Sequence, residues 1–233
     1  MVTTDELRRE ISEIFATTWQ KRNGLKVPNS DEIKLGNDAV KINATVMYAD
    51  LVKSTELVDS YKDHFAAEIY KSYLVATCRI IKDSGGIITA FDGDRVMAVF
   101  FGQSMNTTAV ITALKINYAV NEIVNPALMS QYSNTPYRIR QAVGIDTSDL
   151  FVAKTGIWGN NDLVWVGRAA NYAAKLCTLR EDGYKTYVTK AVFDAMNETA
   201  KIGGNPKQSM WEERKWTSMD NITIYRSSWQ WSF

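Results

Sequence analysis

Histidine and cysteine are almost absent from this chain of 233 residues, which has one histidine, His64, and two cysteines, Cys78 and Cys177. One histidine rules out a histidine-rich metal site and disfavours a Ser-His-Asp triad. Two cysteines cannot build a four-cysteine zinc site or a disulfide scaffold. Carboxylates, amides and cations must therefore carry any chemistry.

Long apolar runs and an excess of one charge are also missing. The longest aliphatic and aromatic run covers residues 96–101, whereas about 20 residues are needed to cross a bilayer. The first ten residues carry acids instead of the apolar segment of a secretory signal. With 27 Lys plus Arg against 26 Asp plus Glu, the net charge is +1, which gives no general attraction to nucleic acid or an anionic membrane. We therefore expect a cytoplasmic protein without nucleic-acid or membrane partners.

The beginning of the chain is expected to differ from the rest. In residues 4–22 apolar side chains recur at helical spacing with charges between them, which predicts an amphipathic helix. The stretch that follows is rich in Gly, Pro, Asn and Asp and has no sustained period, as is typical of a connector. We expect two parts, a helix with its connector at residues 1–40 and a main domain at residues 41–233.

The main domain shows strand and helix patterns in the order β-α-β-β-α-β, which is typical of ferredoxin-like α+β folds. The patterns predict a buried strand at 44–49, a helix over 60–84, a hairpin of strands at 87–91 and 96–101, a helix over 107–124, strands at 138–145, 151–154 and 163–166, and a helix over 168–179. Shorter strand and helix patterns follow towards the C-terminus. The expected fold is thus ferredoxin-like with an elaborated C-terminal end.

Tryptophan is concentrated near the end of the chain. Four of the seven tryptophans, Trp211, Trp216, Trp229 and Trp231, lie in the last 23 residues. Aromatic rings offer large apolar areas. We expect this tail to pack into a core or a subunit interface.

Two aspartates stand where neighbouring strands of such a sheet end. Asp50 follows the first buried strand, and Asp94 lies in the turn of the hairpin. Either one alone is explained by the local preference of aspartate for turns. In a ferredoxin-like sheet, however, the first strand is central and neighbours the hairpin, so the two carboxylates can converge at one edge. Mg²⁺ suits such a pair because it is usually held by one or two carboxylates plus substrate phosphates.

Four segments resemble, in family order, the motifs of the class III nucleotidyl cyclases. Residues 48–55, YADLVKST, resemble F-x-D-I-x-G-F-T, and residues 89–94, TAFDGD, resemble the K-T-x-G-D hairpin. Residues 140–147, RQAVGIDT, resemble R-I-G-I-H-T-G, and residues 167–176, GRAANYAAKL, resemble G-x-x-V-N-x-A-x-R-L. The resemblance implies a ferredoxin-like class III cyclase fold, with residues 41–233 as the catalytic domain. It also implies a homodimer with active sites at the interface.

The resemblance further implies the chemistry. Asp50, Asp94 and the main-chain carbonyl of Leu51 would hold two divalent cations, Mg²⁺ or Mn²⁺. One ion would activate the ribose 3′-hydroxyl for attack on the α-phosphorus, and the other would steady the departing pyrophosphate. The product would be a 3′,5′-cyclic nucleotide.

Two residues of the last motif are four positions apart, hence on one face of one helix. By resemblance, Asn171 orients the ribose and Lys175 faces the α-phosphate. The family usually has arginine where Lys175 stands. Lysine supplies a point charge without a planar fork, so Lys175 is either a weaker phosphate contact or a solvated lysine.

The positions that read a purine base in this class carry other residues here. Counting from the motifs gives Ala90, four residues before Asp94, and Val164, seven before Asn171. Neither side chain can hydrogen-bond a base, which would remove most purine discrimination. The enzyme is then either unselective or reads a different base with different residues. Tyr48 shares a strand face with Asp50 and either narrows the base pocket or is an ordinary core tyrosine.

This constellation resembles the Pycsar pyrimidine cyclases, bacterial enzymes that answer phage infection by making cyclic UMP or cyclic CMP. The resemblance implies conversion of UTP, with CTP as the alternative, and a separate effector protein that the product activates. Lys53 and Arg95 are candidate triphosphate contacts or surface charges, and Lys215 is a weak match to a phosphate-directed lysine of the family. Other readings are a purine cyclase, a nonenzymatic nucleotide-binding or dimerisation module, and a diguanylate-cyclase-like enzyme. The last of these lacks its G-G-[DE]-E-F run.

Overall fold

The computed structural model describes residues 1–233, which form two compact units. The first unit comprises residues 1–43 and 149–167, and the second comprises residues 44–148 and 168–233. No helix has the length and apolar character needed to span a membrane.

The first unit begins with a helix that is shorter than the sequence pattern predicts. Helix α1 (Thr4–Ala16) starts at a capping box between Thr3 and Glu6 and has no buried residue. The prediction of a helix up to residue 22 is wrong, because β1 (Gln20–Asn23) pairs in parallel with β2 (Asp38–Leu51). The ring of Trp19, the last apolar residue of the helical pattern, lies edge-on to the ring of Phe151 with centroids 5.0 Å apart. This contact holds the chain in an extended path.

The remaining elements of the first unit are η1 (Ser30–Glu32) and β6 (Asn160–Val166), which pairs antiparallel with the end of β5 (Gln141–Ile157). The second unit contains most of the sheet and nine segments of helix. Its elements are α2 (Ser54–Ser60), α3 (Asp63–Asp83), β3 (Ile87–Asp92), β4 (Arg95–Phe100), α4 (Met105–Ala119), η2 (Val120–Val124), α5 (Asn125–Gln131), α6 (Arg168–Leu176), β7 (Thr186–Thr189), α7 (Lys190–Ala195), η3 (Glu198–Ala200), β8 (Ile202–Gly203), β9 (Gln208–Ser209), β10 (Glu212–Trp216), η4 (Thr217–Met219) and β11 (Ile222–Ser227).

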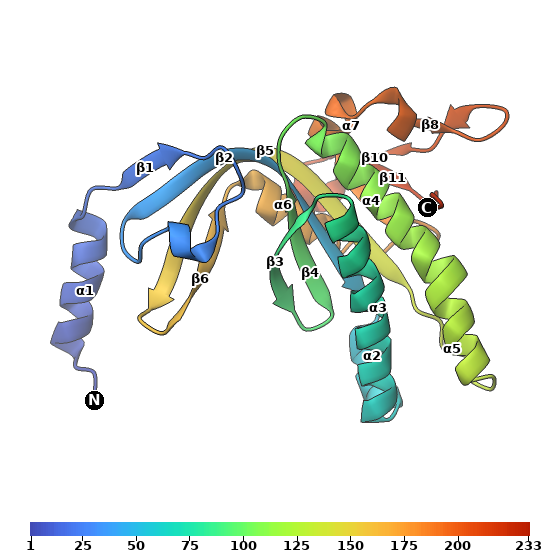
Figure 1. The fold of residues 1–233 in the computed structure, drawn as a ribbon, viewed down its shortest axis with the longest axis horizontal. Helices are drawn as coiled ribbons and strands as arrows, with labels where there is room; N and C mark the ends of the chain where they lie inside the picture. Colours follow the sequence, from blue (N-terminus) through green and yellow to red (C-terminus); the bar gives the residue numbers. More distant parts are fainter. The chain divides into compact units, whose positions relative to one another are not determined.

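The strand order confirms the predicted ferredoxin-like α+β fold. The main sheet has the strand order β10-β11-β7-β5-β2-β4-β3. Its neighbouring strands β2 and β5 run side by side in Figure 1. Its part β5-β2-β4-β3 is built from the strands of the β-α-β-β-α-β repeat in the order fourth, first, third, second. Strands β7, β11 and β10 extend the sheet beyond β5, with β7 parallel to β5 and antiparallel to β11. The elaboration therefore lies where the sequence places it, after the repeat.

Strand β5 is one long strand where two shorter ones are predicted. The sequence pattern leaves the polar residues between the two predicted strands unassigned. In the structure their side chains are used by neighbouring groups. The Ser148 hydroxyl accepts a hydrogen bond from the Ala169 amide (2.9 Å), and an oxygen of Asp149 accepts one from the Asn43 side chain (2.8 Å). The backbone remains extended because these partners come from other segments, which a local pattern cannot reveal.

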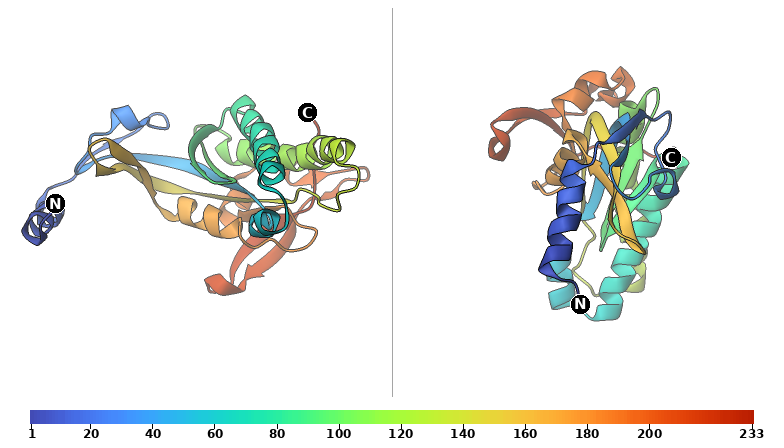
Figure 2. Two further views of the ribbon diagram at one scale, coloured as in Figure 1. Left: turned by 90° about the horizontal axis from the view of Figure 1, so that it is seen from below. Right: turned by 90° about the vertical axis from the view of Figure 1, so that its left-hand side faces the viewer.

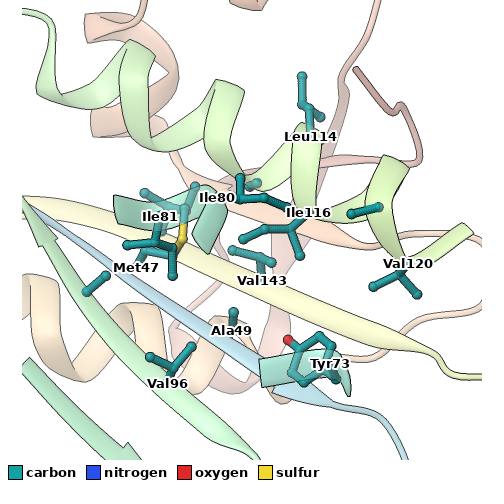
Figure 3. Packing of buried hydrophobic residues seen from close by; sticks show 14 of the residues in the cluster. Met47, Ala49, Tyr73, Ile80, Ile81, Val96, Leu114, Ile116, Val120 and Val143 are labelled. Atoms are coloured by element: carbon teal, nitrogen blue, oxygen red, sulfur yellow. The ribbon is translucent and has the colours of Figure 1, made fainter. Parts of the chain in front are cut away.

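The two faces of the sheet in the second unit differ sharply. On one face, alternate residues such as Met47, Ala49, Val96 and Val143 pack against α3 and α4 and form the main core (Figure 3). Burying an aliphatic side chain of this size contributes about 1.5–3 kcal/mol. On the other face lie the intervening residues of the same strands, and α6 packs there, opposite α3 and α4 (Figure 2).

The close approach of α6 to the sheet depends on Gly144 in β5. A Cβ atom at this position would lie 2.2 Å from the carbonyl oxygen of Ala173 and 2.6 Å from the amide nitrogen of Cys177. Both are backbone atoms, so a larger residue would push the helix away from the strand. Gly144 therefore fixes the distance of α6 from the sheet face that carries Asp50.

The tryptophan-rich tail packs into the core of the second unit, as predicted. Trp211 and Trp216 are buried, and the Trp211 indole donates a hydrogen bond to the Ala200 carbonyl (2.7 Å). Trp229 and Trp231 lie against the main core. The tail is thus an integral part of the domain.

Candidate active site

The structure brings Asp50 and Asp94 to the same edge of the sheet. Asp50 lies near the end of β2 and is 3% exposed. The register that pairs Ala49 with Val96 continues to place Asp50 beside Arg95, the residue after Asp94. Asp94 occupies the second position of a two-residue hairpin turn, after Gly93 with a φ of +61°. Glycine at the first position is the requirement of a type II′ turn, so the Gly-Asp pair fixes where the second carboxylate stands.

The two carboxylates interact electrostatically. Burial, and then the charge of Asp50, raise the pKa of Asp94, while the Ser54 hydroxyl and Arg180 act in the opposite direction. Oxygen Oδ2 of Asp94 is buried and has no hydrogen-bond partner. A buried acceptor without a donor, next to a second carboxylate, is a place where a cation is favoured.

Two arginines flank the Asp50 carboxylate. A guanidinium nitrogen of Arg180, Nη2, donates to Oδ2 of Asp50 at 2.6 Å, and Nε of Arg95 lies 3.6 Å from the same oxygen. The Nε atoms of both arginines are buried without hydrogen-bond partners. Sequence reasoning missed Arg180, which belongs to none of the motifs and follows α6 in a turn. It has a φ of +47°, a conformation uncommon for a residue other than glycine.

The residues of this edge fit a divalent cation. Nowhere in the chain do three side chains of His, Cys, Asp or Glu gather as a metal cluster, so two carboxylates are the side-chain ligands on offer. Leu51 is fully buried at the end of β2, and the next amide, of Val52, donates to the Arg140 carbonyl (2.8 Å). Few protein ligands, all oxygen, suit Mg²⁺ or Mn²⁺ bound together with phosphates.

Tyr48 and Ala90 lie on the same face as Asp50. Both are register partners of Met97, so the three form a row across β2, β4 and β3. The row is two residues from Asp50, about 7 Å along the strand. Tyr48 packs against Val52, Ala142 and Cys177, and burial raises its pKa. The row offers an aromatic ring and apolar groups beside the carboxylates, with one hydroxyl that stays protonated at neutral pH.

Three other predicted contacts are placed as follows. Val164 lies in β6 opposite Ala153, belongs to the first unit and is 39% exposed. Lys53 has a φ of +64° and pairs with Glu56 on the surface, with Nζ 2.8 Å from Oε1. Lys215 donates to the Thr223 hydroxyl at 2.7 Å.

Asn171 and Lys175 are exposed on one side of α6. The opposite side of this helix is buried and consists of Ala169, Ala170, Ala173 and Leu176. Nζ of Lys175 lies 3.5 Å from the sulfur of Met219, and neither Asn171 nor Lys175 hydrogen-bonds Asp50 or Asp94. Within one chain, Asn171 and Lys175 are therefore separated from Asp50 and Asp94.

A buried carboxylate anchors the start of α6. Asp146 is fully buried and accepts hydrogen bonds from Arg168 at 3.0 Å and from the Thr189 hydroxyl at 2.5 Å. Arg168, the first residue of α6, also donates to the Thr147 carbonyl at 2.7 Å. Together with Gly144, this network fixes the orientation in which α6 presents its exposed side.

Comparisons with known structures define the class of the fold. A guanylyl cyclase named Cya2 superimposes with a TM-score of 0.68 at 17% sequence identity, covering 82% of this chain and 94% of its own. The fold is that of the class III nucleotidyl cyclases. No protein-family profile matches the chain.

Sequence comparisons identify the family within this fold class. The uridylate cyclase of Xanthomonas perforans is 48% identical over 228 residues, covering 97% of both chains. The uridylate cyclase of Burkholderia cepacia is 44% identical over 234 residues, covering 100% of both. The chain belongs to the uridylate cyclase family.

The electrostatics of the carboxylate pair predict the behaviour of an Asp94→Asn variant. Because the pKa of Asp94 is raised on folding, its ionised form destabilises the metal-free protein once the pH rises above the ordinary carboxyl pKa. In EDTA at pH 7 we expect the variant to unfold at a higher temperature than the wild type. The difference should shrink towards pH 4, where Asp94 takes up its proton. Thermal denaturation followed by circular dichroism measures both.

The matched control is Asp92→Asn, which removes the same charge from an exposed residue of the same hairpin. It should leave the midpoint within about 1 °C, since isolated surface charges contribute little. A midpoint for Asp94→Asn at or below that of the wild type at pH 7 would contradict the destabilisation by ionised Asp94 that its raised pKa implies.

Proposed function

We propose that this chain is a pyrimidine nucleotidyl cyclase that converts UTP to 3′,5′-cyclic UMP and pyrophosphate. The observation that carries the proposal is the pairing of buried Asp50 with half-buried Asp94 at one sheet edge, where Asp94 leaves an oxygen without a donor. The uridylate cyclases to which the chain is related support UTP as the substrate. CTP is the alternative.

The metal ligands proposed are Asp50, Asp94 and the carbonyl of Leu51. When bound, two Mg²⁺ or Mn²⁺ ions lower the pKa of the ribose 3′-hydroxyl and offset the charge of the phosphates. Asp94 suits this role because its buried oxygen Oδ2 lacks a donor and a cation would relieve its repulsion with Asp50. Residues 41–233 form the proposed catalytic domain.

The protein side chains position the phosphates and offset their charge. In the reaction the 3′-oxygen loses its proton and forms a bond to the α-phosphorus, and the bond from that phosphorus to the bridging oxygen breaks as pyrophosphate leaves. Nε of Arg95 lies 3.6 Å from Asp50 but makes no hydrogen bond, which leaves its buried N–H as a donor suited to a phosphate oxygen. Lys53 is a second proposed contact, and it must exchange its partner Glu56 for the phosphates.

The base site is proposed around Tyr48. The positions where purine cyclases commonly carry base-reading side chains hold Ala90 and Val164, which offer no hydrogen bond. Tyr48 and Ala90 are both register partners of Met97 and lie on one face of the sheet. The Tyr48 ring packs against Ala142 and Cys177 and would narrow a base pocket on this face. A smaller pyrimidine ring suits a pocket of this kind better than a purine.

The complete site is proposed to need two chains. Each chain carries one carboxylate pair and one copy of Asn171 and Lys175. Asn171 and Lys175 lie on the exposed side of α6, away from the carboxylate pair of their own chain. A homodimer with two-fold symmetry would bring Asn171 and Lys175 of the partner subunit to the carboxylates, twice per dimer. There Asn171 would orient the ribose and Lys175 would face the α-phosphate.

The resemblance to the Pycsar cyclases supports a role for the product. We propose that the cyclic pyrimidine nucleotide is a second messenger of anti-phage defence. It would bind and activate a separate effector protein. The cyclase itself would need no contact with that effector.

The reaction is tested by incubating the purified protein with each of the four ribonucleoside triphosphates and Mg²⁺ or Mn²⁺. We expect cyclic UMP and pyrophosphate from UTP, identified by mass, at a rate at least about tenfold above the other triphosphates. Asp50→Ala should lower this rate by at least about a thousandfold, because a carboxylate ligand is lost.

Asp92→Asn serves as the control and should keep the wild-type rate. Full activity of Asp50→Ala would refute the metal assignment. Faster turnover of ATP or GTP than of both pyrimidine triphosphates would refute the proposed substrate class.

The shared site is tested by mixing two inactive variants, Asp50→Ala and Asn171→Ala. In a mixed dimer one site carries both substitutions and the other carries neither. After subunit exchange at equal amounts, half of the dimers are mixed, so about a quarter of the wild-type activity should return. A mixture of Asp50→Ala with Asp94→Ala should stay inactive, because both substitutions fall on the same half of the site. No recovery in the first mixture, despite exchange, would contradict the shared site.

The base site is tested with Tyr48→Ala and Tyr48→Phe. Removing the ring should lower the preference for UTP over ATP by about tenfold or more, because the pocket widens. The Phe variant keeps the ring and should retain most of the preference. The Mn²⁺ concentration that gives half-maximal rate should change less than twofold in both variants. Unchanged ratios among the four triphosphates in Tyr48→Ala would remove Tyr48 from the base site.

A further inference from the structure

The Asp50 carboxylate already has a cationic partner within the chain. It is 3% exposed, and its Oδ2 accepts a hydrogen bond of 2.6 Å from Arg180. A charge-assisted hydrogen bond of this length to a buried carboxylate is among the stronger polar contacts in proteins. A divalent cation on the same oxygen would have to compete with the guanidinium.

The turn that carries Arg180 is held on both sides. The next residue, Glu181, accepts a salt bridge from Arg226 at 2.6 Å, and its amide donates to the Tyr187 hydroxyl at 2.8 Å. The pair of Arg140 with Asp182 (2.8 Å) is on the surface, with the Asp182 side chain 97% exposed, and adds little to this support. With its φ of +47°, Arg180 therefore occupies a backbone conformation that the surrounding contacts impose. The surrounding contacts therefore orient the Arg180 side chain towards Asp50.

The Arg180 guanidinium has unused donor capacity. Its Nε–H is buried without a partner, although the side chain as a whole is 32% exposed. A planar guanidinium binds phosphate oxygens through two of its nitrogens at once, whereas Lys175 offers a point charge only. Arg180 can thus pair with the Asp50 carboxylate through one nitrogen, and it can bind a triphosphate through two.

We propose that Arg180 pairs with Asp50 in the nucleotide-free enzyme and moves to the triphosphate when metal and nucleotide bind, so that the two ligands bind cooperatively. The inference rests on the proposed function of the carboxylate pair. When metal binds alone, it must displace Arg180 from Asp50, and the displaced guanidinium gains no new anionic partner. Metal with a triphosphate gives the released guanidinium a new anionic partner. By thermodynamic linkage, each ligand then strengthens the binding of the other by the same factor.

The test uses Mn²⁺ and inorganic tripolyphosphate, which carries no base or ribose. Binding of Mn²⁺ to the full chain is followed by electron paramagnetic resonance, with Arg180→Gln compared with the wild type. We expect about tenfold tighter binding of Mn²⁺ alone, because the competing cation is gone. In saturating Mn²⁺, tripolyphosphate should bind about tenfold more weakly. The factor by which tripolyphosphate tightens Mn²⁺ binding should fall accordingly.

Arg140→Gln is the matched control, since it removes one positive charge from the partner of Asp182, two residues after Arg180, and leaves Asp50 paired. Its Mn²⁺ affinity should stay within about twofold of the wild type. Arg180→Gly is the second variant, because glycine readily adopts the positive φ of this turn. It should repeat the Arg180→Gln result with an unchanged circular dichroism spectrum.

The role of Arg180 and the metal assignment are contradicted by different results. Unchanged or weaker Mn²⁺ binding in both Arg180 variants would overturn the role of Arg180, as would equal tightening in Arg140→Gln. Asp50→Asn should lose Mn²⁺ binding. If it binds Mn²⁺ like the wild type, the metal assignment of the proposed function is wrong, whatever the Arg180 variants show.

Discussion

The repulsion between two carboxylates at one sheet edge is the constraint on which the rest of this structure depends. Asp50 is buried and Asp94 half-buried, and burial, followed by the charge of Asp50, raises the pKa of Asp94. The folded chain tolerates this arrangement because Arg180 and Arg95 lie beside Asp50. Oδ2 of Asp94 nevertheless stays buried without a donor beside a second carboxylate, which makes this edge a place where a further cation is favoured.

The fold supports this edge from both faces of the sheet. On one face α3 and α4 pack against the alternate residues of β2 and β4, which leaves Asp50 and Tyr48 to point the other way. On that other face Gly144 admits α6 to within contact of the strand. The chain thus uses one helix pair to bury its core and a third helix to present Asn171 and Lys175 at a fixed height above the sheet.

The sequence allowed the fold class and the carboxylate pair to be predicted, since both depend on local patterns and on a known order of strands. Asp50 ends an apolar strand, and Gly-Asp between two β-prone runs is a hairpin turn. Arg180 could not be found in this way. It reaches Asp50 across 130 residues of sequence, from a turn whose conformation is supported by Arg226 and Tyr187. The same reason explains the errors at β1 and β5, where partners distant in sequence decide the path of the backbone.

Helix α4 depends on a segment made long after it. The Asn117 side chain donates to the Trp229 carbonyl at 2.9 Å, and the Leu114 carbonyl accepts a bond from the Trp231 amide at 3.1 Å. Contacts this distant in sequence form late in folding. While the ribosome is still making the chain, α4 lacks its cover and the core stays open. A partly made chain can therefore close its core only after translation has passed the final tryptophans.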